Sequence, residues 1–347
     1  MKRLLGEDIK KKESLMDHFM RVISVRGDGA NPSDLYVDEA PRPETGAGSV
    51  LIRISHAGVN RPDILQRRGL YPPPPGAAPG LGLEVSGWIE AIHPAVPYAD
   101  DVAWRVGDPV CALVNGGGYA EYVAVDLRHL LPIPAGWSMA QAASLPEAAL
   151  TVYANLIEHG GLQPGETVLV HGGNSGIGAM TIQLGKAWGA KVIATARGAD
   201  KCEFARSLGA DLVIDTTVDE DFVTAVKGAG GADVVLDIVA GDYVAKNLLC
   251  LNHKGRMVQV GTGRSPVVEL DLRRVMQKQA VITGSMLRPR SADEKARLTT
   301  KVHEKLWPLV ESGAIKPVLA QTFAFADAAS AHAWMDESHC GKVVLQI

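Results

Sequence analysis

Cysteine is scarce in this sequence, which contains only four: Cys111, Cys202, Cys250 and Cys340. They lie far apart, and no pair has the C-x-x-C spacing. This arrangement excludes a disulfide framework and a four-cysteine zinc ribbon. We therefore expect the protein in a reducing compartment, the cytoplasm.

Long apolar runs and an excess of one charge are also missing. No uninterrupted apolar stretch could cross a bilayer, and the net charge is -4 with both signs mixed along the chain. We expect neither a membrane nor a nucleic-acid partner. Residues 1–16 lack the apolar core of a signal peptide and contain acids that a transit peptide normally avoids, so we interpret them as a disordered extension.

The segment 167–196, TVLVHGGNSGIGAMTIQLGKAWGAKVIATA, organises the rest of the chain. Its apolar, β-branched start predicts a buried parallel strand. A glycine cluster follows, and apolar residues then recur at helical spacing until Gly189. Residues 191–196 indicate the next strand. This order is half of a dinucleotide-binding fold, in which a pyrophosphate approaches the glycines and the N–H groups of the helix N-terminus.

The glycine fingerprint departs from G-x-G-x-x-G because Ser175 occupies the middle position. The strand before it and the helix after it favour dinucleotide binding over an unrelated glycine-rich turn. A G-x-S-x-G nucleophile elbow is excluded, since Ile177 stands at the last glycine position. We interpret His171, at the end of the strand, as a packing residue. The predicted pyrophosphate-binding residues are Gly173, Asn174, Ser175, Gly176 and Ile177.

The end of the second strand predicts which dinucleotide is bound. An NAD enzyme usually places an acid there for the ribose 2′-hydroxyl. Here the strand ends at Thr195 and Ala196, followed by Arg197 and, after a short turn, Lys201. These cations would attract a 2′-phosphate, so NADPH is favoured over NADH. The alternative is that both are ordinary surface charges.

The pattern of expected secondary structure changes near residue 142. Short β-like segments rich in Gly and Pro fill the first part, whereas strands and helices alternate from 142 to 281. The lone terminal strand, 342–347, needs a sheet to join. We therefore predict a catalytic domain made of 17–141 and 282–347, with a nucleotide domain of 142–281 inserted between its two parts.

Several stretches together resemble the medium-chain dehydrogenase/reductase superfamily, and within it the zinc-independent quinone oxidoreductases. They are AGVNRPDILQRRGLYPPPPG (57–76), PGLGLEVSG (79–87), RVGDPVCALVNGGGYAEYVAV (105–125), LPEAALTVYANL (145–156) and HGGNSGIG (171–178). The resemblance implies an α/β protein: a GroES-like β-rich catalytic domain plus a Rossmann domain with a doubly wound parallel sheet. It also implies a homodimer, formed through the edge of the nucleotide domain.

Zinc-dependent members of that superfamily carry a cysteine near position 60 and a Gly-His-Glu motif at 82–84. Here the first stretch reads VNRPD (59–63), and Leu83 replaces the histidine. Leucine has no lone pair for zinc, so we expect no catalytic metal. Without a Lewis acid, the chemistry suits acceptors that are already electrophilic. Hydride from C4 of NADPH would then reduce a quinone, an enone or an enoyl thioester.

The resemblance places Asn60 near the nicotinamide ribose and substrate, Tyr71 at substrate oxygen, and Thr151 at the nicotinamide or ribose. The alternatives are a turn-forming Asn, a packing aromatic and an ordinary helix threonine. Asp63 belongs either to a proton relay or to the first turn of a helix, and we favour the helix. The fifth nucleotide-domain strand ends in Val260, Gly261 and Thr262, whose backbone we expect beside the nicotinamide.

The sequence favours an NADPH-dependent quinone oxidoreductase. A second candidate is an enoyl-thioester or alkenal reductase, which would need a basic patch for a carrier phosphate, such as Arg67 with Arg68 or Arg288 with Arg290. A third candidate, of another class, is a non-catalytic NADPH-binding structural or RNA-associated protein.

Overall fold

The computed structural model describes residues 18–94, 104–218, 221–337 and 339–347, and the predicted extension 1–16 lies outside these ranges. The chain forms two compact units. Unit 1 takes its described residues from Met1–Glu147, Leu319–Ser338 and Lys342–Ile347, and unit 2 comprises Ala148–Val318 and His339–Gly341. Within the described part, no helix has both the length and the apolar character of a membrane span.

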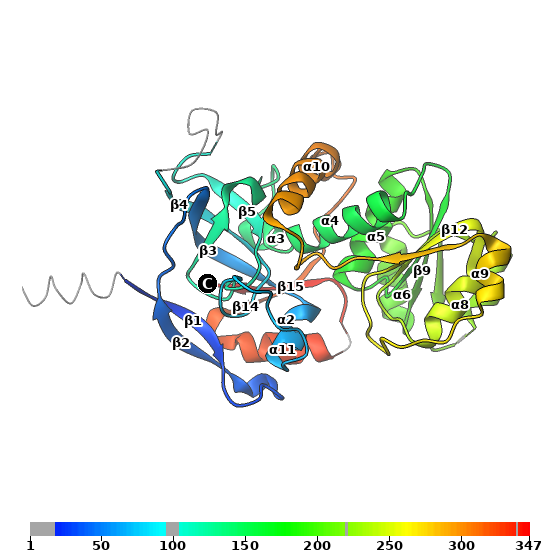
Figure 1. Cartoon of the computed structure of the whole chain (residues 1–347), viewed down its shortest axis with the longest axis horizontal. Coiled ribbons are helices and arrows are strands. Elements are labelled where there is room, and N and C mark those ends of the chain that lie inside the picture. The colour runs from blue at the N-terminus through cyan, green and yellow to red at the C-terminus, as the bar shows by residue number, and fades with distance from the viewer. Residues whose placement is uncertain (1–17, 95–103, 219–220, 338) are drawn as a thin grey trace, which may run out of the picture. The chain divides into compact units, whose positions relative to one another are not determined.

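Unit 1 is built on β-sheet. Among its described residues, β1 (Phe19–Val25) and β2 (Leu35–Pro41) form an antiparallel hairpin. A second sheet has the order β14-β15-β3-β4-β5-β7, with β6 also paired to β3. Its strands are β3 (Ser49–Val59), β4 (Glu84–Ile92), β5 (Pro109–Leu113), β6 (Tyr122–Asp126), β7 (Leu130–Pro132), β14 (Leu319–Ala324) and β15 (Lys342–Gln346). The helical elements are η1 (Pro32–Asp34), α2 (Arg61–Arg67), η2 (Leu127–His129), α3 (Met139–Ala142), η4 (Phe325–Asp327) and α11 (Ala328–Asp336), and α11 packs beside β2 (Figure 1).

The terminal strand joins unit 1, as the sequence predicts. β15 lies between β14, to which it is parallel, and β3, to which it is antiparallel. Val343, Val344 and Leu345 are all completely buried. An apolar run without alternation is typical of a strand covered on both faces, and here it fixes β15 inside the sheet.

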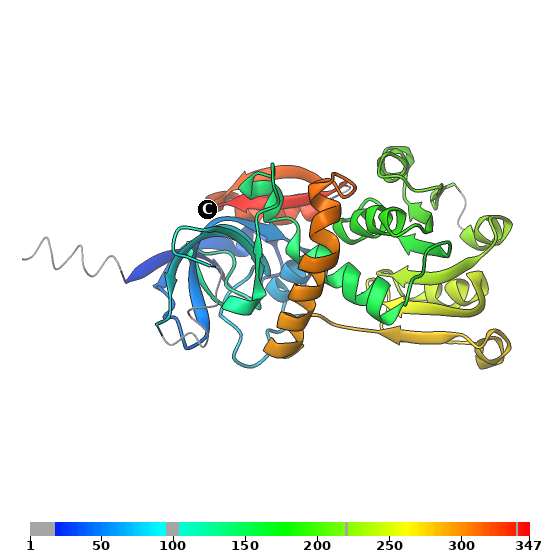
Figure 2. The ribbon, with the colours of Figure 1, turned by 90° about the horizontal axis from the view of Figure 1, so that it is seen from above.

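Unit 2 contains a six-stranded parallel sheet within its described residues, in the order β10-β9-β8-β11-β12-β13. This order confirms the predicted doubly wound sheet, because the direction of winding reverses between β8 and β11. The strands are β8 (Thr167–His171), β9 (Lys191–Ala196), β10 (Leu212–Asp215), β11 (Ala232–Asp237), β12 (Leu251–Gln259) and β13 (Val281–Gly284). The helices that follow the strands are α5 (Gly176–Ala187), α6 (Ala199–Ser207), α7 (Phe222–Gly228), α8 (Asp242–Cys250) and α9 (Leu272–Lys278), and β13 and α9 lie at one margin of the unit (Figure 2).

The small residues of 138–150 predict one helix in the sequence, but the structure has two helices there. Ser138 accepts a hydrogen bond from the Gln141 backbone N–H at 3.2 Å and caps α3, and α4 (Pro146–Val152) begins at a proline. Proline suits the first position of a helix but not its interior, so it divides the segment. α4 runs on into a π-helix, η3 (Tyr153–His159).

Residues 282–318 lie in unit 2, whereas the predicted division placed them in the catalytic domain. β13 bonds to β12, and the long helix α10 (Ala292–Glu311) is tied to η3 by a bidentate Arg297–Glu158 pair at 2.6 and 2.9 Å. The sequence predicts a helix only over 301–312, but α10 begins at Ala292 because Ser291 and Glu294 form a capping box. Local sequence patterns do not predict the β13–β12 and Arg297–Glu158 contacts, because they join residues that lie far apart in the chain.

Candidate functional site

The glycine turn between β8 and α5 has the close packing that a phosphate-binding loop requires. Gly172 has φ +67°, and a Cβ on Gly178 would lie 2.1 Å from the Gly172 carbonyl oxygen. Ser175 closes the turn: its hydroxyl donates to Gly172 O at 2.8 Å and accepts from Gly178 N–H at 3.0 Å. The serine in the middle of the fingerprint is therefore the N-cap of α5.

The first N–H groups of α5 remain for a ligand. Gly176 and Ile177 occupy its first turn, where backbone N–H groups have no partner within the helix. A pyrophosphate fits this end of α5 by charge and by hydrogen bonding. Asn174 instead fastens the segment 339–341 to the turn. Its amide donates to His339 O at 2.7 Å, and its backbone carbonyl accepts from Gly341 N–H at 2.9 Å.

The end of β9 presents cations, as predicted. Arg197 is exposed and Lys201, in the first turn of α6, is half-buried. Among the described residues, neither has an ion-pair partner. Asp215 instead accepts the Gly198 N–H at 2.9 Å and shapes the turn between them. A 2′-phosphate would meet two positive charges here.

Thr195 is used differently from the prediction. Its hydroxyl is buried and hydrogen-bonds His171 Nδ1 at 2.9 Å. His171 Nε2 contacts Asn247 Oδ1 at 2.7 Å, and the ring packs edge-on against Tyr243. Burial lowers the pKa of His171. His171 is thus a satisfied packing residue, as expected, and the Thr195 hydroxyl supports it.

Two other predicted contacts lie in unit 2. Val260 and Gly261 follow β12 at the carboxyl edge of the sheet, and Val260 N–H donates to Asp237 O at 2.8 Å. The neighbouring Thr262 is exposed. Thr151, on α4, is buried, yet its hydroxyl has no hydrogen-bond partner among the described residues. A buried polar group without a partner is costly, so a hydrogen bond from a ligand would stabilise Thr151.

In unit 1, Asn60 lies at the start of α2 and its side chain belongs to a buried ionic cluster. Its amide donates to Glu84 Oε1 at 2.9 Å, while its carbonyl oxygen accepts from Lys342 Nζ. Lys342 Nζ also lies 2.6 Å from Glu84 Oε1, and the other Glu84 oxygen accepts Glu147 N–H at 2.9 Å. We call Asn60, Glu84 and Lys342 the Asn60 cluster. It leaves one amide hydrogen of Asn60 for a ligand.

Asp63 adjoins that cluster as a helix-stabilising residue. It is completely buried and accepts from Asn60 N–H at 2.8 Å and Gly82 N–H at 2.9 Å. Burial raises its pKa to about 6, opposed by these hydrogen bonds. The carboxylate thus ties the start of α2 to the loop before β4. This favours the helix interpretation over a catalytic role.

A chain of buried hydrogen bonds continues from Asp63. Tyr119 hydrogen-bonds Asp63, and its hydroxyl lies 3.1 Å from His332 Nε2. His332 Nδ1 lies 3.3 Å from Arg67 Nη1. Because arginine can only donate, Nδ1 is the acceptor and Nε2 carries the hydrogen toward Tyr119. Burial lowers the pKa of His332 to about 3, which keeps the ring neutral.

Tyr71 lies half-buried in the loop between α2 and β4, beside Leu70, which is 69% exposed. The residues around Glu84 do not fit a zinc ion. Leu83 is buried and offers no donor, and the ammonium group of Lys342 already neutralises the Glu84 carboxylate. In the part of the chain described, no group of three or more His, Cys, Asp or Glu could hold a metal.

Sequence reasoning missed Lys342 as a site residue and treated Glu84 only as the end of a motif. Tyr119 and His332 were also missed. One signal was present: lysine stands at the head of the apolar run KVVLQI, and a charge at the edge of a buried strand needs a partner. The identity of that partner depends on pairing across the sheet.

Comparisons with known proteins agree with this architecture. Residues 46–135 match the alcohol dehydrogenase GroES-like domain family, and residues 176–302 match the zinc-binding dehydrogenase family. An NAD-dependent alcohol dehydrogenase structure is 30% identical, with a TM-score of 0.80, covering 94% of this chain and 100% of that one. A mycobacterial protein solved with NADPH is 29% identical, with a TM-score of 0.84, covering 94% and 100%.

Two curated relatives differ in length. Quinone oxidoreductase of Mus musculus is 29% identical over 82% of this chain and 84% of its own length. A phenolphthiocerol synthesis polyketide synthase of Mycobacterium marinum is 36% identical over 68% of this chain, but the match spans only 11% of that enzyme. The chain has the two-unit fold of the dehydrogenases that it matches. It belongs to the medium-chain dehydrogenase/reductase superfamily.

Proposed function

We propose that this protein is an NADPH-dependent quinone oxidoreductase that works without zinc. The observation that carries the proposal is the Asn60 cluster. In this cluster the ammonium group of Lys342 pairs with Glu84, close to the positions at which zinc-dependent relatives have metal ligands. Such a site can polarise a hydrogen-bond donor but offers no Lewis acid. It suits an acceptor, such as a quinone, that is already electrophilic.

The chain's own residues would bind and orient the cofactor. The first N–H groups of α5 hold the pyrophosphate, and Arg197 and Lys201 hold the 2′-phosphate. The unpartnered hydroxyl of Thr151 serves the ribose or the nicotinamide. When bound, NADPH supplies a hydride from C4 of its nicotinamide.

Asn60 would stabilise the reduced acceptor. Lys342 donates to the Asn60 carbonyl oxygen and draws electron density from the amide, which makes the remaining N–H of that amide a stronger donor. As hydride reaches the quinone ring, negative charge develops on a quinone oxygen. The Asn60 N–H stabilises that charge, and a proton from water completes the hydroquinone.

Burial of one arginine in each predicted basic pair disfavours a thioester substrate. The side chain of Arg67 is completely buried and bonds Gly29 O at 3.1 Å, and Arg288 is 5% exposed. Arg68 and Arg61 share Asp336 at 2.7 and 3.0 Å. Neither pair therefore offers two exposed guanidiniums to a carrier phosphate. The likeness to a solved enoyl reductase, 26% identical with a TM-score of 0.82, keeps the alkene reductase as a second candidate.

The test is NADPH oxidation, followed by its near-ultraviolet absorbance, with a benzoquinone, a naphthoquinone, phenanthrenequinone, an enone and crotonyl-CoA, each repeated with NADH. Turnover of quinones with NADPH preferred is the expected result. Turnover of crotonyl-CoA or the enone alone would assign an alkene reductase. Tight NADPH binding without any turnover would support the non-catalytic alternative. Metal analysis should find no stoichiometric zinc, and one zinc per chain would contradict the proposal.

We also propose a homodimer formed through the β13 edge of unit 2. β13 pairs only with β12 among the described strands, so its other edge has unpaired backbone groups. Large apolar side chains surround that edge: Ile282 is 41% exposed, Leu272 67% and Met276 70%. An exposed apolar strand edge favours pairing with another chain, and a second copy presents the same edge.

A further inference from the structure

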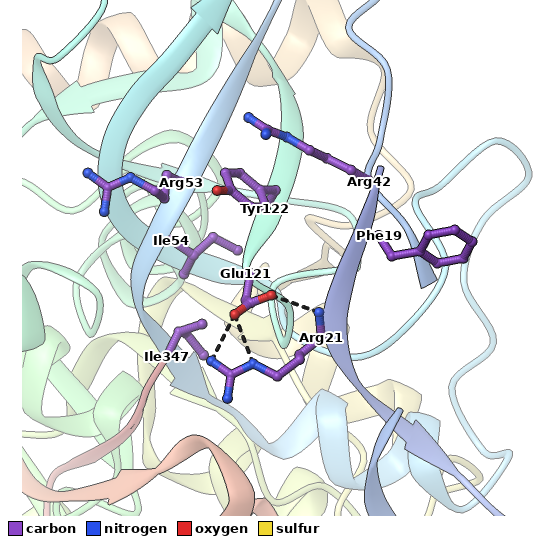
Figure 3. Close-up of a pocket in the computed structure, with 8 residues that line it drawn as sticks. All are labelled: Phe19, Arg21, Arg42, Arg53, Ile54, Glu121, Tyr122 and Ile347. Carbon is purple, nitrogen blue, oxygen red and sulfur yellow. Dashed lines mark hydrogen bonds and ion pairs between the residues drawn. The ribbon is translucent and has the colours of Figure 1, made fainter. Parts of the chain in front are cut away.

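Unit 1 contains a cavity that the proposed function does not use. It has a volume of about 300 Å³ and lies where the β1–β2 hairpin meets strands β3 and β6 (Figure 3). Its polar lining consists of Arg21, Arg42, Arg53, Glu121 and Tyr122. All of these residues belong to unit 1, whereas the glycine turn belongs to unit 2.

Each arginine is held by an aromatic ring. The Arg42 guanidinium lies 3.8 Å from the centroid of Tyr122, and Arg53 lies 4.7 Å from that of Trp88. Arg21 lies 5.6 Å from the ring of Phe325. Stacking of this kind fixes the plane of a guanidinium while its N–H edge stays available, so little entropy is lost when a ligand binds.

The carboxylates do not balance these charges. Arg21 forms an ion pair with Glu121 at 2.8 Å (Figure 3). Arg42 and Arg53 share a single carboxylate, Glu90, at 3.2 and 3.4 Å. In these ion pairs, three guanidiniums are matched by only two carboxylates. Most N–H groups of Arg42 and Arg53 have no other partner among the described residues, and each guanidinium has five.

Tyr122 adds a donor of another kind between these two arginines. Its hydroxyl, which has no hydrogen-bond partner in the described residues, points toward Arg53 (Figure 3). Donors therefore reach the cavity from two guanidiniums and a phenol, on separate segments of the chain. A flat carboxylate is satisfied by a single guanidinium edge, whereas a tetrahedral phosphate presents oxygens in several directions. The geometry favours a phosphate.

We propose that this cavity binds the phosphate group of a small phosphate monoester. Arg42 and Arg53 hold the phosphate oxygens, and the Tyr122 hydroxyl donates to a third. The cavity is larger than a phosphate ion, and Ile54 and Ile347 give it an apolar side for the organic part of the ligand. The site is independent of the proposed quinone reduction.

Calorimetric titration with phenyl phosphate tests the proposal. The background protein carries Arg197→Ala and Lys201→Ala, which removes the predicted 2′-phosphate site. Arg53→Gln and Arg42→Gln should each weaken phenyl phosphate binding at least about tenfold. Arg26→Gln is the matched control, because Arg26 also follows a strand of the hairpin and stacks on a ring, Tyr36, at 4.4 Å, but does not line the cavity.

Glu90→Gln provides a variant whose predicted effect cannot come from misfolding. It leaves both guanidiniums without their shared carboxylate, so phenyl phosphate should bind several-fold more tightly. Unchanged affinity in Arg42→Gln and Arg53→Gln, or weaker binding in Glu90→Gln, would overturn the proposal. Benzoate binding as tightly as phenyl phosphate would overturn the choice of phosphate, and inorganic phosphate binding as tightly would overturn the monoester.

Discussion

Lys342 and Glu84 form a buried ion pair at 2.6 Å, with side chains 5% and 0% exposed, although their strands β15 and β4 are separated by β3. Lys342→Met would leave the Glu84 carboxylate buried without its cation. We expect a loss of about 3–5 kcal/mol in the free energy of unfolding, measured by urea denaturation.

The double variant Lys342→Met with Glu84→Gln distinguishes an uncompensated charge from lost packing. It removes both charges, so much of the stability should return. If the double variant is as unstable as Lys342→Met alone, the electrostatic explanation is wrong.

Asn60→Ala removes the proposed donor to the reduced acceptor. Loss of one such donor typically lowers kcat by about 10²–10³. Because the cofactor is held mainly by unit 2 in this proposal, the KM for NADPH should change little. Steady-state kinetics with a quinone would show the separation, and a large rise in the KM for NADPH with unchanged kcat would contradict it.

Asp63 should make stability depend on pH. Its pKa is raised from 3.8 to about 6, so the folded state holds its proton more strongly than the unfolded chain. The stabilisation is therefore present in acid and is lost as pH rises through about 6. Relative to Asp63→Asn, the native protein should become more stable by about 2–3 kcal/mol between pH 7 and pH 4.

The comparison with Asp63→Asn cancels the contribution of His332, which is common to both proteins. The pKa of His332 is lowered to about 3, so folding favours its neutral form. Lowering the pH therefore destabilises the folded state through His332, whereas it stabilises the folded state through Asp63. A difference between the two urea-unfolding profiles that stays constant from pH 7 to pH 4 would show that Asp63 is not perturbed.

Arg197→Ala with Lys201→Ala should raise the KM for NADPH at least about tenfold, because in the proposal each cation forms a charge-assisted bond with the 2′-phosphate. The KM for NADH should hardly change. Arg206→Ala is a suitable control, since Arg206 lies on α6, the helix that carries Lys201, but forms an ion pair with Glu203 at 3.3 Å. Equal effects on the two cofactors would contradict the 2′-phosphate assignment.

Ile282→Glu should convert a dimer to monomers. A charge on β13 would be desolvated at the proposed interface, and like charges from the two copies would face each other. Sedimentation velocity would show the change in mass. Glu269→Lys, at an exposed position in the loop before α9, serves as a charge-change control. A monomeric native protein would refute the proposal directly.

The sequence predicted the parts of the fold that depend on local patterning. Apolar runs located the nucleotide-domain strands, and the glycine turn located α5. Proline at the first position of a helix indicates where α4 begins, at Pro146. The regular spacing of small residues across 138–150 hid this boundary in the sequence. Lys342 could not be assigned a partner, since Glu84 lies 258 residues away and the pairing depends on the order β15-β3-β4.

The position of β15 has a consequence for synthesis on the ribosome. Nearly all of unit 2 is complete in sequence before residues 342–346 emerge, and its own sheet needs none of them. The sheet of unit 1 cannot close until β15 enters between β14 and β3. A nascent chain can therefore form its dinucleotide-binding half first. The arrival of Lys342 then completes the Asn60 cluster, so the proposed cofactor-binding turn is made before the proposed reduction site.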